Sequence, residues 1–175
     1  MIVYKQATLD VELHEILSLQ EANLPENLSE EEKIAEGFIT VKHTFALLKE
    51  MNEVCKHTIA TIEDKVIGYA LSMDHSFGDK IPILKPMLNE IDSIIEQKNS
   101  YIIMGQICIA KDYRGKGIFR GLYQAMKRFI PTTYTKIITE VDAKNKRSIA
   151  AHKAIGFKEL KRYRADDREW ILVDF

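Results

Sequence analysis

A long apolar run that leads into a pair of glycines constrains the fold of this chain more than any other feature. Residues 101–110 are nearly all apolar, and Gly115 and Gly117 follow them closely. Apolar residues then recur at helical spacing over 118–129, just before a proline. The sequence therefore predicts a buried strand, a tight turn and an amphipathic helix in direct succession.

Such a turn is suited to binding an anion. The first backbone N–H groups of a helix have no partner within the helix, and the helix dipole adds partial positive charge at the same end. Arg114 and Lys116 bring two cationic side chains to the turn, so a phosphate or pyrophosphate is the expected ligand. A glycine pair also serves as a plain turn, and this simpler interpretation stays open for the turn taken alone.

Two familiar phosphate-binding loops fit this segment less well. An NTPase loop needs lysine and then serine or threonine directly after its last glycine, but Leu122 follows Gly121. A dinucleotide-binding loop would use an acidic residue on the next strand, for which Glu140 and Asp142 are suitably spaced. That fold continues from its glycine motif through a long βαβαβ array, whereas only residues 143–175 remain here. The topology therefore argues against a dinucleotide site.

The remainder of the chain alternates strand and helix patterns of ordinary length. Strands are expected at 2–7, 58–62, 66–71, 136–141, 158–163 and 169–175, and helices at 10–24, 44–54, 87–97 and 145–155. The strands at 58–62 and 66–71 form a hairpin, and Gly156 ends the last helix. The expected fold is α/β (α+β), with one mixed, mostly antiparallel sheet of about seven strands flanked by helices, in a single domain over 1–175.

Composition excludes several function classes. The 25 basic and 26 acidic side chains give a net charge of -1, so no strong basic field favours nucleic acid. No stretch reaches the ~20 apolar residues of a membrane span, and no secretory leader is evident at the first residues. Cys55 and Cys108 do not form a disulfide pattern, which favours a cytoplasmic protein. A glutamate-rich connection is expected to be a solvated face; it contains Glu26, Glu30, Glu31, Glu32 and Glu36.

Residues 107–118, with the sequence ICIAKDYRGKGI, resemble the coenzyme A signature of the GNAT N-acetyltransferase superfamily. In that family the next helix carries an asparagine, a small residue three positions on, often a tyrosine at seven, and Gly-Phe at eleven and twelve. The matching residues here are Asn145, Ser148, His152, Gly156 and Phe157. The resemblance spans 101–157, and the element order outside this window also agrees with the family fold.

The resemblance implies that acetyl-CoA or CoA is a co-substrate. The strand residues whose backbone would pair with the pantetheine arm, where this strand splays from its neighbour, are Ile107, Cys108 and Ile109. The amides that would hold the pyrophosphate are those of Arg114, Gly115, Lys116, Gly117, Ile118 and Phe119. Asn145 and Ser148 would complete the coenzyme site. Phe119 departs from the family's small residue, and we expect its ring to turn toward the core.

The implied reaction is N-acetylation by direct attack of a primary amine on the thioester carbonyl. His152 replaces the family's frequent tyrosine and is the candidate general acid, because histidine donates protons near neutral pH. Glu140 is the candidate general base. A structural histidine and a solvated glutamate are the alternatives for these two positions. Cys108 is interpreted as a core residue rather than a nucleophile.

The expected partner is a small-molecule or peptide amine, with a homodimer left open. Cys55 and His57 are close in sequence, but the histidines and cysteines lack zinc-ligand spacing, so no metal is expected. The rival interpretation is a non-catalytic module of the same fold that senses coenzyme A. Phe119 and His152 are the residues that keep this alternative open.

Overall fold

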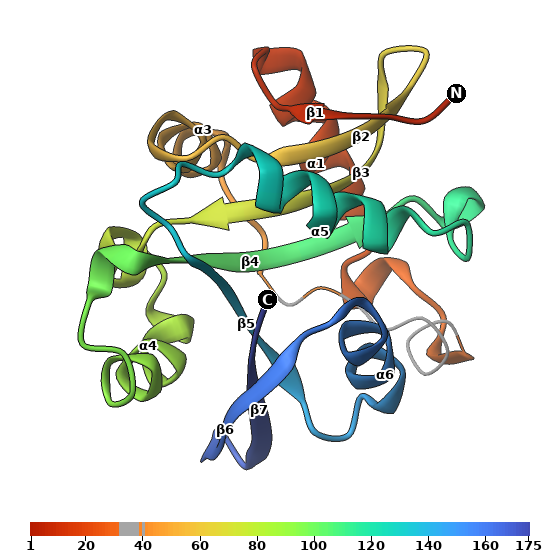
Figure 1. The fold of residues 1–175 in the computed structure, drawn as a ribbon. Helices are drawn as coiled ribbons and strands as arrows, with labels where there is room; N and C mark the ends of the chain where they lie inside the picture. The colour runs from red at the N-terminus through yellow and green to blue at the C-terminus, as the bar shows by residue number, and fades with distance from the viewer. Residues whose placement is uncertain (32–38, 40) are drawn as a thin grey trace. The chain divides into compact units, whose positions relative to one another are not determined.

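The computed structural model describes residues 1–31, 39 and 41–175. Within this part of the chain, seven strands form one sheet in the order β1-β2-β3-β4-β5-β7-β6 (Figure 1). The strands are β1 (Val3–Gln6), β2 (Thr58–Ile62), β3 (Lys65–Met73), β4 (Tyr101–Ile109), β5 (Lys136–Asp142), β6 (Lys158–Ala165) and β7 (Arg168–Asp174). The α-helices are α1 (Asp10–Ala22), α3 (Phe45–Val54), α4 (Lys85–Asp92), α5 (Ile118–Phe129) and α6 (Lys146–Ile155). Short 3₁₀ helices lie at Pro25–Asn27, His75–Lys80, Pro82–Leu84, Lys98–Ser100 and Lys111–Tyr113.

The strand pairing confirms the predicted mixed sheet flanked by helices. β1 pairs antiparallel with β2, β2 with β3, β5 with β7, and β6 with β7. β4 pairs in parallel with β5 over Tyr101–Ile103. Glu63 and Asp64 adopt positive φ angles of 49° and 62° in the predicted hairpin turn between β2 and β3, as a two-residue hairpin loop requires.

The chain divides into two compact units, each built from two segments. The first unit contains residues 1–72 and 105–130, and the second contains residues 73–104 and 131–175. β4 passes from the second unit into the first at Gly105. The expectation that residues 1–175 act as one domain stays a prediction.

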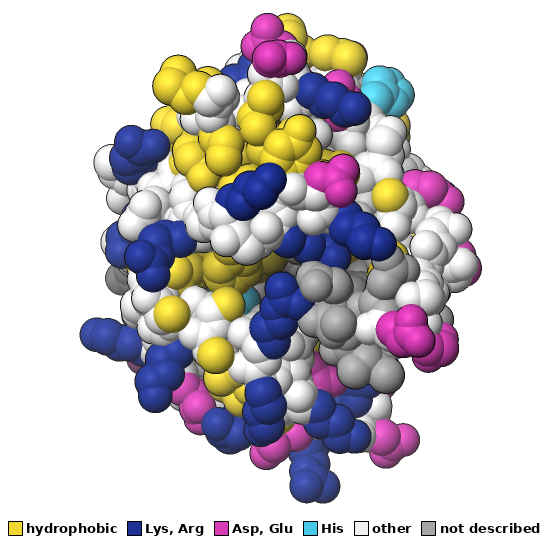
Figure 2. Space-filling view, turned by 90° about the vertical axis from the view of Figure 1, so that its right-hand side faces the viewer, with side chains coloured by type: hydrophobic (Ala, Val, Ile, Leu, Met, Phe, Trp, Pro, Cys, Tyr) yellow, Lys and Arg dark blue, Asp and Glu magenta, His cyan; other side chains and the backbone are white. Residues whose placement is uncertain are grey.

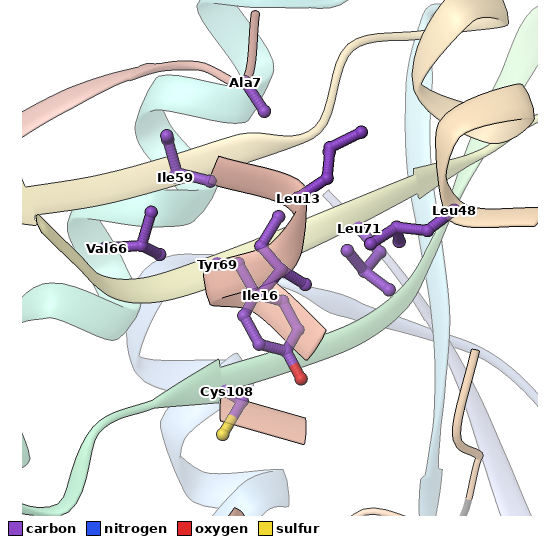
Figure 3. Close-up of a cluster of buried hydrophobic side chains, with 9 residues drawn as sticks. All are labelled: Ala7, Leu13, Ile16, Leu48, Ile59, Val66, Tyr69, Leu71 and Cys108. Atoms are coloured by element: carbon purple, nitrogen blue, oxygen red, sulfur yellow. The ribbon is translucent and has the colours of Figure 1, made fainter. Parts of the chain in front are cut away.

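The core of the first unit lies where α1 and α3 pack against its strands (Figure 3). Leu13 and Ile16 of α1 and Leu48 of α3 are buried against strand residues that include Ile59 and Tyr69. The complete cluster consists of Ala7, Leu13, Ile16, Leu48, Ile59, Val66, Tyr69, Leu71 and Cys108. Burying one leucine or isoleucine of this kind contributes about 1.5–3 kcal/mol, so this cluster anchors both helices.

Helix α5 packs against β1 and β2 in the same unit. Its buried face carries Ile118, Leu122, Tyr123, Ala125 and Met126. Gly121 brings this helix against Tyr4, since a Cβ added there would lie 2.2 Å from the tyrosine ring atom Cζ. The predicted amphipathic helix therefore forms with the predicted bounds, and its N-terminus directly follows the glycine pair.

In the second unit, side chains of α6, β5 and β7 line one cavity, and an aromatic stack lies just after the C-terminus of α6. Gly156 adopts a φ of 109° as the C-cap, and the Phe157 ring lies 5.0 Å from the Phe175 ring in a stacked pair. The helix predicted at 87–97 instead forms as α4, Lys85–Asp92. Ser93 follows its end, and the Ser93 hydroxyl donates to the Glu90 carbonyl at 2.7 Å. Local bonding of this kind competes with continued helix and accounts for the earlier end.

The glutamate-rich connection is described only in part. Glu26, Glu30 and Glu31 are exposed, as predicted for a solvated segment. Glu32 and Glu36 lie outside the described residues.

Candidate functional site

The glycine turn, which we define as Arg114–Gly117, forms an open backbone cradle at the start of α5. Gly115 and Gly117 have φ angles of 72° and 78°, and no heavy atom lies within 4 Å of a Cβ added at either position. Gly117 is the N-cap of α5, so no side chain caps this 12-residue helix. Glycine tolerates positive φ and leaves room for a ligand to approach the backbone. This geometry fits the pyrophosphate of a coenzyme.

Both cationic side chains of the glycine turn are held by the protein. Arg114 donates from Nε to the Ile109 carbonyl at 3.1 Å and from Nη2 to Asn23 Oδ1 at 2.6 Å. Lys116 donates from Nζ to the Asp112 carbonyl at 2.9 Å. The arginine therefore ties the turn to the end of β4 and to the residue after α1, which makes Asn23 a supporting residue that sequence reasoning missed.

Positive charge is nevertheless abundant near this turn. In Figure 1 the turn lies toward the right, and Figure 2, which views the molecule from that side, shows many lysine and arginine side chains among apolar ones. The basic residues in the turn and beside it are Lys111, Arg114, Lys116 and Arg120. Such a surface attracts an anionic ligand.

The strand residues predicted to face the pantetheine arm lie at the end of β4. Ile107 and Ile109 are half-buried, whereas Cys108 is buried in the core cluster. Burial raises the pKa of the Cys108 thiol, so the reactive thiolate is disfavoured. This supports the interpretation of Cys108 as a core residue.

The two coenzyme residues predicted on the second motif lie at the start of α6. Asn145 is the N-cap, and its Oδ1 accepts a hydrogen bond from the Ser148 backbone N–H at 2.9 Å. This cap accounts for an asparagine at this position even without a ligand. A role of Asn145 and Ser148 in coenzyme binding therefore stays a prediction.

His152 is a buried histidine, with 4% of its surface exposed. Its Nδ1 lies 2.8 Å from the Ser148 carbonyl oxygen; because a carbonyl only accepts, Nδ1 carries the proton. Burial lowers the pKa of His152, so the neutral ring dominates at pH 7. The ring lines a 360 Å³ cavity of the second unit, together with Val141, Ile149, Lys153, Phe157, Lys158, Glu159, Ile171 and Val173.

Glu140 lies on β5, directly opposite Leu172 of β7. The Tyr163 hydroxyl of β6 donates a hydrogen bond to Glu140 Oε2. Burial raises the pKa of Glu140, and the bond from Tyr163 offsets this increase in part. Tyr163 is a second supporting residue that sequence reasoning missed, since no motif points to it.

The predicted site residues therefore fall into two groups. The strand residues Ile107–Ile109 and the glycine turn through Phe119 belong to the first unit, and Glu140, Asn145, Ser148 and His152 belong to the second. Phe119 is half-buried, with its ring against Tyr123 at 5.1 Å. That the two groups act together at one catalytic site stays a prediction. The expected splay of β4 from its neighbour also stays a prediction.

Neither a metal-binding cluster nor a membrane-spanning helix is present in the described ranges 1–31, 39 and 41–175. No group of three or more histidine, cysteine, aspartate or glutamate side chains there could hold a metal ion. No helix in that part of the chain is long and apolar enough to cross a membrane.

Comparison with known proteins decides the family. The family model described as the acetyltransferase (GNAT) family matches residues 13–157. The chain belongs to the GNAT acetyltransferase family. A comparison with curated protein sequences gives no significant match.

Solved structures similar to this GNAT chain show the same fold at low sequence identity. The ribosomal-protein-S18-alanine N-acetyltransferase of Escherichia coli is 16% identical, with a TM-score of 0.61 over 100% of this chain and 93% of that one. A chain of the NatC complex, solved with Gag peptide and CoA, is 17% identical, with a TM-score of 0.63 over 99% and 97%. The yncA protein of Salmonella typhimurium, solved with acetyl-CoA, is 11% identical, with a TM-score of 0.63 over 99% and 92%.

Proposed function

We propose that this GNAT protein is an N-acetyltransferase that moves an acetyl group from acetyl-CoA to a primary amine, with residues 1–175 acting as one domain. The observation that carries the proposal is the open glycine turn at the N-terminus of α5. Gly115 and Gly117 present an unobstructed backbone there, which is the arrangement that a pyrophosphate requires. The acceptor is a small-molecule or peptide amine.

The coenzyme roles follow the predicted residues. The backbone of Arg114–Phe119 holds the pyrophosphate, and the backbone of Ile107–Ile109 pairs with the pantetheine arm. Asn145 and Ser148 add contacts at the start of α6. Acetyl-CoA supplies the activated acetyl group, and the proposed compartment is the cytoplasm, where the buried thiols of Cys55 and Cys108 stay reduced.

The acyl transfer needs one proton acceptor and one proton donor. The amine nitrogen forms a bond to the thioester carbonyl carbon, the carbon–sulfur bond breaks, and the amine proton passes to Glu140. His152 supplies a proton to the departing sulfur. The neutral tautomer described above carries its proton on Nδ1, which faces the Ser148 carbonyl. A donor role therefore requires the doubly protonated ring, so the reaction should favour lower pH.

Calorimetric titration with acetyl-CoA tests the coenzyme site. Gly117→Ala places a Cβ in the cradle and should weaken binding by roughly tenfold or more. Gly156→Ala is the matched control, because Gly156 also has a positive φ but meets only Phe175, at 3.6 Å. Gly156→Ala also forces alanine into a positive φ, of 109° against 78° at Gly117, and should bind normally.

Three results of this titration would count against the proposal. Folded wild-type protein that binds no acetyl-CoA at millimolar concentration would remove its basis. Equal affinity in the two alanine variants would place the pyrophosphate elsewhere. Stronger binding of NAD(P) would favour the dinucleotide interpretation.

A coenzyme A sensor of the same fold is the second candidate function. It is favoured by the buried state of His152 and by the lowering of its pKa, which disfavour a proton donor at neutral pH. Release of free thiol from acetyl-CoA in the presence of an amine panel separates the two functions. Binding without thiol release under any condition would identify the sensor.

A further inference from the structure

On one face of the second unit, Glu140 is surrounded differently from the neighbouring carboxylates. Strand register places Glu140, Tyr163 and Trp170 on the same side of β5, β7 and β6, since Tyr163 is directly opposite Trp170 and Glu140 is opposite Leu172. Side chains at opposed positions of an antiparallel pair point to the same face. The Tyr163 side chain of β6 and the Glu140 side chain of β5 therefore lie on either side of β7, on the face that carries Leu172, and form their hydrogen bond there.

Three carboxylates on this side of the sheet or on the neighbouring helix α4 have a basic partner. Asp174 of β7 pairs with Lys136 of β5, and Asp142 lies 3.8 Å from Arg168. On α4, Glu90 lies 2.6 Å from Lys161 of β6. These are three matched pairs of opposite charge.

Glu140 differs from these carboxylates. Among the described residues, it receives one hydrogen bond, from the neutral Tyr163 hydroxyl, and makes no ion pair. Burial opposes its charge, and Tyr163 partly offsets that effect. A half-buried carboxylate without a cation has an unfavourable electrostatic environment that a bound cation would relieve. Aromatic side chains beside it favour the same kind of ligand, because ring faces attract cations.

We propose that Tyr163 is a positioning residue that orients Glu140, and that this pair selects acceptors that arrive as protonated primary amines. The ammonium group pairs with the Glu140 carboxylate and transfers one proton to it. Glu140 releases that proton to water, so the neutral amine attacks and the regenerated carboxylate takes the second amine proton. Tyr163 holds the carboxylate and stabilises its charged form between turnovers. This inference rests on the proposed function.

The first test is the pH dependence of kcat/KM in Tyr163→Phe. Loss of the hydrogen bond raises the pKa of Glu140, so the acidic limb should move to higher pH by about one unit. The KM for acetyl-CoA should stay the same. Tyr134→Phe is the matched control, since the Tyr134 hydroxyl also donates to a carboxylate, Asp74, at 2.8 Å in the same unit. Its pH profile should match the wild type.

The second test needs no catalysis and no coenzyme. The carboxyl ¹³C shift of Glu140, assigned with Glu140→Gln, reports its titration directly. In Tyr163→Phe the midpoint should rise by about one pH unit. The positioning role would be overturned if wild type and Tyr163→Phe gave the same Glu140 titration midpoint and the same pH–rate profile. If the midpoint rises in Tyr163→Phe but the protein shows no turnover, only the proposed function is refuted.

The third test concerns the amine. Wild type should favour alkylamines, which are charged at neutral pH, over arylamines of similar size, which are not, by tenfold or more in kcat/KM. Glu140→Gln should lose this preference together with most of the rate. Equal use of both amine classes by the wild type would overturn the selectivity.

Discussion

His57 makes the stability of this protein depend on pH in a way that can be calculated. Its side chain is fully buried, with Nδ1 accepting from the Ser72 backbone N–H at 3.1 Å and Nε2 donating to the Leu48 carbonyl at 3.1 Å. A proton added to Nδ1 would face the Ser72 N–H, and the charge would be buried. Burial accordingly lowers the pKa of His57 to about 3.

The sign and size of the effect follow from linkage. The unfolded chain has a histidine pKa near ~6.5, so it takes up a proton on acidification while the folded protein does not. Stability from this group is complete above about pH 6.5 and is lost as pH falls toward the folded pKa. Between about pH 8 and pH 5 the loss is roughly 2 kcal/mol, because each pH unit below the unfolded pKa costs about 1.4 kcal/mol.

Urea unfolding of wild type and His57→Gln at both pH values measures this loss. Glutamine offers a carbonyl for Ser72 and an amide for Leu48, but it does not titrate. The variant should be less stable near pH 8, and the difference from wild type should shrink by roughly 2 kcal/mol near pH 5. If the difference in unfolding free energy between wild type and His57→Gln is the same at both pH values within about 0.5 kcal/mol, His57 titrates in the folded protein as it does in the unfolded chain, and the argument fails.

Two further predictions concern His152 and Gly121. His152→Ala should lower kcat by about 10²-fold with coenzyme affinity intact. Wild-type activity should fall as pH rises through the pKa of His152, which burial lowers. In His152→Tyr this alkaline fall in activity should move to higher pH. An alanine variant with parental turnover would make His152 structural. Gly121→Ala should add about 1 kcal/mol of helix propensity only in a Tyr4→Ala background, because the Tyr4 ring occupies the new methyl position in the wild type. Urea unfolding of the four proteins measures this coupling, and an equal effect in both backgrounds would contradict the packing argument.

The sequence determined the features that depend on neighbours along the chain. The bounds of α5 and the hairpin of β2 and β3 follow from periodicity and turn residues, both of which act over a few positions. The glycine turn is equally local, because Gly115 and Gly117 adopt positive φ angles of 72° and 78° that other residues rarely reach. The resemblance by which the sequence predicts the GNAT family rests on the same short segments.

The partners of the functional side chains could not be predicted in this way. Arg114 contacts Asn23 from a position 91 residues away, and Tyr163 reaches Glu140 across 23 residues. His57 owes its lowered pKa to complete burial by distant segments. Such contacts depend on packing and on strand register, which alternation in a single strand does not specify.

The contact between Tyr163 and Glu140 depends on one register shift in β6, between Glu159 and Lys161. Lys158 is opposite Asp174 and Glu159 opposite Val173, but a register shift follows, so that Tyr163 is opposite Trp170. Without that shift Tyr163 would be opposite Glu169 and would point away from Glu140, because a one-residue slip exchanges the two faces of a strand. The sequence supplied both side chains, and the bulge between two paired strands placed them together.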